Sequence, residues 1–155
     1  MFGWFKELFT LIKMLFSKVE HKDELDMVIM KHFPFRGYAY MMWCGSIIAR
    51  KKNANIKAES LKHEWIHNEQ AALRYKKWIG YYWKYIREWI KGNPLIAPAS
   101  GAYMTIPFEM EAYANASNKD YKPTLESLEK YVIKKHRKKI YRTNRKNWIE
   151  YLKSL

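Results

Sequence analysis

The chain has 155 residues, of which 48% are apolar and 17% are aromatic, so a disordered protein is excluded and one domain with one core is expected. The formal net charge of +14 predicts attraction to an acidic partner, such as an anionic membrane surface or a nucleic acid. Cys44 is the single cysteine, which excludes an internal disulfide and favours a cytoplasmic location, with a membrane-peripheral one as the alternative.

Residues 1–20 contain an expected amphipathic helix that begins at about residue 2. Its apolar residues recur at steps of three and four, at Phe5, Leu8, Phe9, Ile12, Leu15, Phe16 and Val19. Lys6, Glu7 and Lys13 interrupt the apolar run, which argues against a membrane span. We expect the helix to pack on its own domain, and the alternative is that it lies on an anionic membrane surface.

Residues 38–50 are rich in aromatic and branched side chains and predict a strand, or a hairpin that turns at Cys44 and Gly45. A helical pattern follows over residues 58–91, with a break expected near Gly80. After a loop that includes residues 95–103, a shorter helix is expected from Pro107 to about Ser117.

A basic closing helix is expected over residues 124–153, with Thr124 as its N-cap. Its cationic side chains surround a thin apolar stripe, at Lys134, Lys135, Arg137, Lys138, Lys139, Arg142, Arg145 and Lys146. A solvated face is the ordinary interpretation of such a cluster, and phosphate contact is the alternative. Of the two candidate acidic partners, a nucleic acid is therefore less expected than an anionic membrane surface.

The sharpest chemical signal is the sequence HEWIH, which runs from His63 to His67 inside the long helical pattern. Residues four apart lie on one helical face, so both imidazoles can reach one metal ion. Glu64 stands beside the first ligand and can act as a catalytic base toward a water on that metal. Two surface histidines on an ordinary amphipathic helix are the alternative interpretation.

A catalytic zinc ion needs a third protein ligand, and carboxylates are the better source because no other histidine falls in a ligand pattern. Glu109 and Glu111 follow Pro107 on the predicted short helix. The alanines at 112, 114 and 116 predict that this helix packs closely on another one. Tyr113 and Tyr103 are the candidate hydroxyls for stabilising an oxyanion, against a plain packing role for each.

HEWIH followed by PFEMEAYANA resembles the gluzincin group of zincin metallopeptidases and small bacterial zincin-like proteins over roughly residues 38–118. His63, Glu64, His67 and Gln70 match the HExxHxxQ element of those small proteins. Their later element is matched by Phe108, Glu109, Glu111, Ala112, Tyr113, Ala114 and Asn115. The gluzincin pattern carries an Asp that this chain lacks, which leaves the choice between Glu109 and Glu111 open. The order E-x-E-A favours Glu109, with Glu111 then positioning a ligand histidine.

The resemblance implies a small, predominantly helical α+β zincin-like domain with a short antiparallel sheet. It also implies a zinc-dependent hydrolase that attacks a peptide or protein substrate. The metal ligands would be His63, His67 and Glu109 or Glu111, and Glu64 would be the base. The alternative is a catalytically inactive zincin-like protein that binds an anionic membrane or a nucleic acid.

Overall fold

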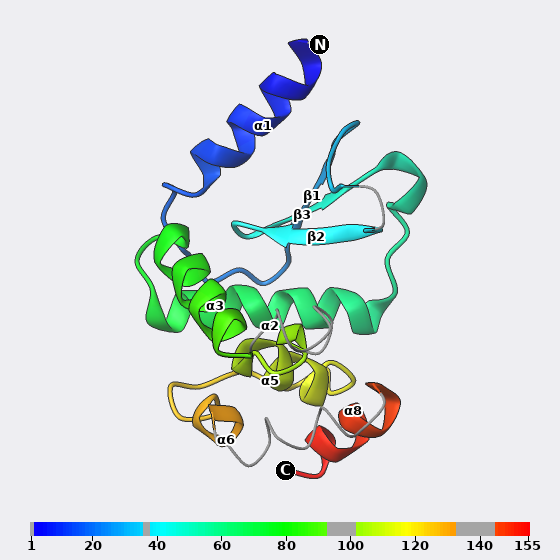
Figure 1. The fold of residues 1–155 in the computed structure, drawn as a ribbon. Coiled ribbons are helices and arrows are strands. Elements are labelled where there is room, and N and C mark those ends of the chain that lie inside the picture. The colour runs from blue at the N-terminus through cyan, green and yellow to red at the C-terminus, as the bar shows by residue number, and fades with distance from the viewer. Residues whose placement is uncertain (1, 36–37, 93–101, 133–144) are drawn as a thin grey trace.

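A three-stranded mixed sheet forms one layer of the fold (Figure 1). The computed structural model describes residues 2–35, 38–92, 102–132 and 145–155. Its strands are β1 (Asp26–Ile29), β2 (Tyr40–Trp43) and β3 (Ser46–Ala49), in the order β1-β3-β2. β2 pairs antiparallel with β3, as predicted, whereas β1 pairs parallel with β3. The expected antiparallel sheet is therefore a mixed one, in a small α+β domain.

The β2–β3 hairpin turns at Cys44 and Gly45, where it was predicted. Both residues have a positive φ, 51° and 76°, which is the conformation of the two central residues in a type I′ turn. Gly45 suits this position, because a Cβ there would also lie 3.2 Å from both Asn68 and Trp78. The turn is thus seated against the two long helices that follow it in the chain.

Those helices are α2 (Ala58–Arg74) and α3 (Trp78–Lys91), after a short 3₁₀ turn, η1 (Lys51–Asn53). The predicted break in this pattern is confirmed, but it lies at Tyr75–Lys77, and Gly80 itself lies within α3. The physical reason is a backbone contact with the chain that follows α1. The Val19 N–H donates to the Lys76 carbonyl at 3.2 Å, and Lys18 and Lys77 form an isolated antiparallel β-bridge. These bonds take residues 76–77 out of the helical path.

Helix α5 (Pro107–Asn115) lies against α2, with α8 (Arg145–Lys153) also packed on it (Figure 1). Its expected start at Pro107 is confirmed, and it ends two residues before Ser117. Seven of its nine residues are buried, at Pro107, Phe108, Glu109, Met110, Glu111, Ala112 and Ala114. Two carboxyl groups therefore lie inside the protein, where each needs compensating partners.

Only parts of the expected basic closing helix fall within the described residues. Thr124 and Ser127 exchange side chain–backbone hydrogen bonds just before α6 (Glu129–Val132). This is the reciprocal arrangement of a helix start. Residues 125–128 nevertheless form turns and α6 begins only at Glu129, so the predicted helix start directly after Thr124 is wrong. Most of the lysines and arginines named above lie at 133–144, outside the described residues, and carry no structural argument.

Helix α1 (Phe2–Met14) is shorter than the expected helix over residues 2–20. The chain turns at residues 15–17 and then runs alongside residues 76–77, which ends the helix early. Among the described residues, no helix is both long and apolar enough to cross a membrane.

Candidate metal centre

Two imidazole rings from one face of α2 meet in the interior. His63 and His67 are both buried, and their Nε2 atoms lie 3.1 Å apart. The helical spacing of four residues brings them together, as the HEWIH pattern predicts. Because both rings are largely withdrawn from water, their nitrogens need partners inside the protein.

Their shared partner is Glu109, which α5 brings to the same point. Its Oε2 lies 3.3 Å from Nε2 of His63, and its Oε1 lies 3.2 Å from Nε2 of His67. The three side chains are all buried, and their ligand atoms lie within 4.8 Å of one another. A tetrahedral zinc site with ligands at about 2.0–2.1 Å has ligand–ligand edges of about 3.3 Å. The two nitrogens lie 3.1 Å apart, and each lies 3.2–3.3 Å from a different Glu109 oxygen, so the three side chains are close enough to hold one metal ion.

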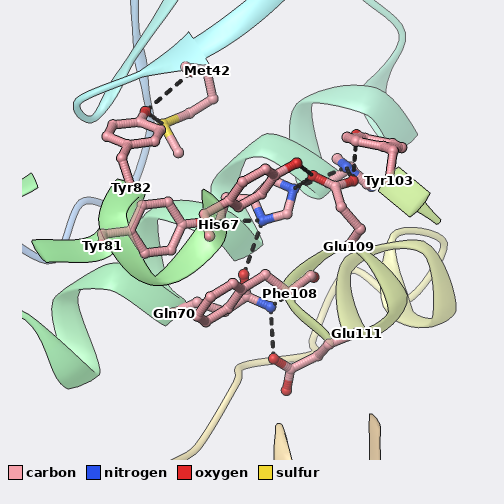
Figure 2. A network of polar contacts seen from close by, with 11 residues as sticks. Met42, His67, Gln70, Tyr81, Tyr82, Tyr103, Phe108, Glu109 and Glu111 are labelled. Atoms are coloured by element: carbon pink, nitrogen blue, oxygen red, sulfur yellow. Dashed lines mark hydrogen bonds and ion pairs between the residues drawn. The ribbon is translucent and has the colours of Figure 1, made fainter. Parts of the chain in front are cut away.

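Two tyrosine hydroxyls hold the Glu109 carboxylate in place. Tyr85 donates to Oε1 at 2.6 Å, and Tyr103 donates to Oε2 (Figure 2). Burial, followed by the charge of Glu109, raises the pKa of both hydroxyls well above the usual value, so both remain donors. Each carboxylate oxygen thus has one tyrosine partner and one histidine partner.

The charges of the cluster are strongly coupled. Burial alone would raise the pKa of Glu109, but the adjacent His67 and His63 rings hold it well below its usual range. Burial would also lower the pKa of His67, yet the Glu109 carboxylate raises it to about 9. The carboxylate and the imidazoles therefore favour one another's charged forms, and a metal ion bound here would require neutral imidazoles and an ionised carboxylate.

The second nitrogen of His67 is held by a glutamine. Nδ1 lies 2.9 Å from the Gln70 Oε1, and the Gln70 amide donates to the Glu111 Oε2 at 2.6 Å and to the Phe108 carbonyl at 3.0 Å (Figure 2). These two acceptors fix the amide orientation, so Oε1 accepts from an Nδ1–H. The Nε2 lone pair of His67 is then directed at the centre, as a metal ligand requires.

Of the two candidate glutamates, the structure brings Glu109 and not Glu111 to the histidines. The Glu111 carboxylate accepts hydrogen bonds from Gln70, from the Tyr121 hydroxyl at 2.8 Å and from the Ser127 hydroxyl. Its effect on His67 passes through Gln70, whereas the sequence suggested direct contact with a ligand histidine. Gln70 is therefore the residue that contacts the second nitrogen of His67, in a chain that lacks the Asp of the gluzincin pattern.

Tyr113 lies against the ring of His63, the other histidine of the cluster. Its ring and that of His63 have centroids 4.4 Å apart with a tilt of 53°. The His63 Nδ1 is buried and has no hydrogen-bond partner among the described residues. Contact with the tilted Tyr113 ring therefore limits the rotation of the His63 imidazole, whereas a hydrogen bond to Gln70 orients that of His67.

A pocket of about 410 Å³ opens onto one side of the centre, lined by His63, Glu64, Tyr103, Tyr113 and residues of α2 and the chain leading into β2. Glu64 is half-buried, and burial raises the pKa of its carboxyl, although the neighbouring histidines lower it. A backbone hydrogen bond from Met42 on β2 also reaches this carboxylate. A carboxylate beside two imidazoles at an open pocket can exchange protons with a bound molecule.

The sequence did not assign the partners that hold the cluster together. Gln70 was noticed only as part of a resemblance, although its spacing of three from His67 places it on the same helical face. Tyr85 and Tyr121 have no distinguishing local pattern in a chain with twelve tyrosines. No protein-family model, curated protein or solved structure matches this chain, so the geometry of the site carries the functional argument.

Proposed function

We propose that this protein is a zinc-dependent hydrolase, and specifically a metallopeptidase of the zincin type. The observation that carries the proposal is the meeting of three buried side chains beside the pocket that Glu64 lines. The Nε2 atoms of His63 and His67 lie 3.1 Å apart, and each lies 3.2–3.3 Å from a different carboxylate oxygen of Glu109. Three protein ligands with one open position are the pattern of catalytic rather than structural zinc sites.

The ligand chemistry favours zinc among the common metals. Two imidazoles and one carboxylate form the His₂Glu set that catalytic zinc accepts, and the site offers neither a thiolate nor a ring of oxygen ligands. The same three ligand types also bind non-haem iron(II). Glu64 favours zinc hydrolysis, because an adjacent carboxylate base is part of the HExxH mechanism.

A bound zinc ion would polarise a substrate carbonyl and lower the pKa of a bound water to about 7. His63, His67 and Glu109 would hold the ion, with Gln70 and two tyrosines keeping their orientations. Glu64 would accept the proton of the attacking water and return it to the leaving amine. The Tyr113 hydroxyl would donate to the oxygen that becomes negative, from its place on the pocket wall.

The decisive experiment measures metal and activity on the same samples. Mass spectrometry of protein purified without chelator should find about one zinc per chain, and His67→Ala should lose it. Hydrolysis of a fluorogenic peptide mixture should accompany the zinc. Iron at the same stoichiometry, or zinc that persists in His67→Ala, would contradict the assignment.

A matched pair of glutamate variants separates catalysis from metal binding. Glu64→Gln should keep the zinc and lose hydrolysis by at least about 100-fold. Glu59→Gln removes another carboxylate from the same pocket and the same helix, and should change both quantities little. Full hydrolysis by zinc-loaded Glu64→Gln would overturn the proposed mechanism.

A further inference from the structure

Helix α1 has two apolar faces, and only one is covered. Leu11 is buried against Met30, Phe33 and Ile48, with Leu8 and Met14 packed beside it. This inner face attaches the helix to the sheet, and the Trp43 indole donates to the Leu11 carbonyl at 2.9 Å. The packing that the sequence favoured therefore exists, but it accounts for half of the apolar residues.

The other face is exposed over the whole helix and the turn after it. We call this face the exposed α1 stripe; its members and their exposed fractions are Phe2 86%, Phe5 57%, Phe9 59%, Ile12 43% and Phe16 58%. Four large aromatic side chains on one outer helical face are far more than scattered surface apolar residues explain. Such a stripe marks a surface that meets a non-aqueous partner.

The charges beside the stripe are all positive. Lys6 and Lys13 are exposed and flank it on the helix, and the Lys13 ammonium lies 4.7 Å from the centre of the Phe9 ring. Glu7 is the only acidic residue of α1, and it is turned inward to accept hydrogen bonds from the Lys31 and His32 backbone amides at 2.9 Å. The outer face thus combines phenyl rings with ammonium groups and no carboxylate.

A second exposed apolar run begins where α1 ends. The Ile79 amide donates to the Leu15 carbonyl at 3.1 Å, which joins the start of α3 to the end of the first helix. Along α3, four large apolar residues recur at helical spacing and are exposed: Ile79 47%, Trp83 65%, Ile86 46% and Ile90 58%. Exposed apolar surface therefore continues beyond α1 itself.

We propose that the exposed α1 stripe binds the surface of an anionic lipid bilayer. Phe5, Phe9 and Ile12 would enter the boundary between headgroups and acyl chains, and Lys6 and Lys13 would contact lipid phosphates. A helix of 13 residues is about 20 Å long, too short for a hydrocarbon core of about 30 Å, so it lies flat on the surface. This inference concerns α1 alone and does not depend on the proposed hydrolase activity.

Charge complementarity decides between a lipid surface and a second copy of the chain. Pairing two copies through this stripe would bring Lys6 and Lys13 of one close to those of the other, on proteins that each carry +14. An anionic bilayer instead attracts each lysine, by an amount worth roughly fivefold in affinity per residue near the surface.

The test is sedimentation of the full chain with sucrose-loaded vesicles. Phosphatidylcholine vesicles with about one-third phosphatidylserine should bind the protein, and pure phosphatidylcholine vesicles should bind it at least about tenfold more weakly. Phe5→Ser with Phe9→Ser should lower binding to the anionic vesicles by at least about tenfold. Leu125→Ser, at a residue that is 63% exposed elsewhere, should not change it.

A second pair of variants, each of which lowers the net charge by two, tests the lysines. Lys6→Gln with Lys13→Gln should weaken binding roughly tenfold or more. Lys119→Gln with Lys122→Gln removes two exposed charges from the loop between α5 and α6, far from α1 (Figure 1), and should have a much smaller effect. Circular dichroism and an unchanged urea midpoint would show that each variant is folded.

Three results would overturn the proposal. The first is equal binding to anionic and neutral vesicles or to neither, and the second is wild-type binding by the Phe5→Ser, Phe9→Ser variant. The third is a dimer in sedimentation equilibrium that this variant converts to a monomer, because a second copy would then cover the stripe.

Discussion

Helices α2 and α5 bury polar groups, whereas helix α1 exposes apolar ones. Between α2 and α5, two histidines and two glutamates lie in the interior, each 8% exposed or less. On the outer face of α1, aromatic rings are more than half exposed. Both arrangements cost free energy relative to an ordinary core and surface.

The two regions compensate for this cost to different degrees. The buried carboxylates have a hydrogen-bonding or ionic partner for each oxygen, so the α2–α5 cluster is nearly complete within the chain. Within the part of the chain that the structure describes, the exposed rings of α1 have only edge and cation–π contacts with neighbours on the same helix, and the proposed lipid surface would supply the missing apolar environment. The polar groups between α2 and α5 thus find their partners within the chain, whereas the exposed α1 stripe is not covered by the described residues.

The sharpest test of the two α1 faces, and the largest expected effect on stability, is Leu11→Ala against Phe9→Ala. Leu11→Ala should lower the free energy of unfolding by about 2–5 kcal/mol, because it leaves a cavity against the sheet. Phe9→Ala, at an exposed position, should change the free energy of unfolding by less than about 0.5 kcal/mol. Urea unfolding measures both, and equal losses would mean that the outer face is packed as well.

The two glutamates of α5 should differ in zinc affinity. Glu109→Gln removes a ligand and should weaken zinc binding by more than about 100-fold, whereas Glu111→Gln acts through Gln70 and should weaken it by about 10–100-fold. Competition with a chromophoric chelator gives both constants. A larger loss in Glu111→Gln would place the metal away from the Glu109 carboxylate.

Zinc should also stabilise the fold. At a free concentration of about 100 times its dissociation constant, it should add about 2.7 kcal/mol, equal to a rise in Tm of roughly 5–10 °C for a chain of this size. A chelator should reverse the rise. The Glu109→Gln variant is the control, because its Tm should respond little to the same zinc concentration.

Local patterns predicted the parts of the molecule that depend on local geometry. The hairpin at Cys44 and Gly45, the helical HEWIH motif and the helix start at Pro107 all follow from rules that span a few residues. The convergence of His63 and His67 belongs to this group, since helical spacing alone places both rings on one face.

Long-range pairing explains what local patterns missed. β1 is a four-residue strand that exists by parallel pairing with β3 across an intervening segment, and no short-range signal marks it. The bend at Tyr75–Lys77 is likewise imposed by the chain after α1, in place of a break at Gly80. The choice between Glu109 and Glu111 depends on how α5 rotates against α2, which two residues of sequence spacing cannot fix.

The smallest expected effect concerns Cys44, whose thiol is buried in the hairpin turn. Burial raises its pKa from 9.0 to about 12, so the folded thiol stays protonated while the unfolded one ionises above about pH 9. Stability from this group is therefore complete below pH 9 and is lost as the pH rises toward 12. Relative to Cys44→Ala, the wild type should lose roughly 1–2 kcal/mol between pH 7 and about pH 10.5.

Urea midpoints of both proteins at the two pH values measure this loss, and the tyrosines common to both largely cancel in the difference. The folded wild type should also react slowly with a thiol reagent at pH 8 and rapidly once unfolded, because Cys44 is only 7% exposed. Parallel pH profiles for the two proteins, together with fast labelling of the folded chain, would mean that the turn opens readily.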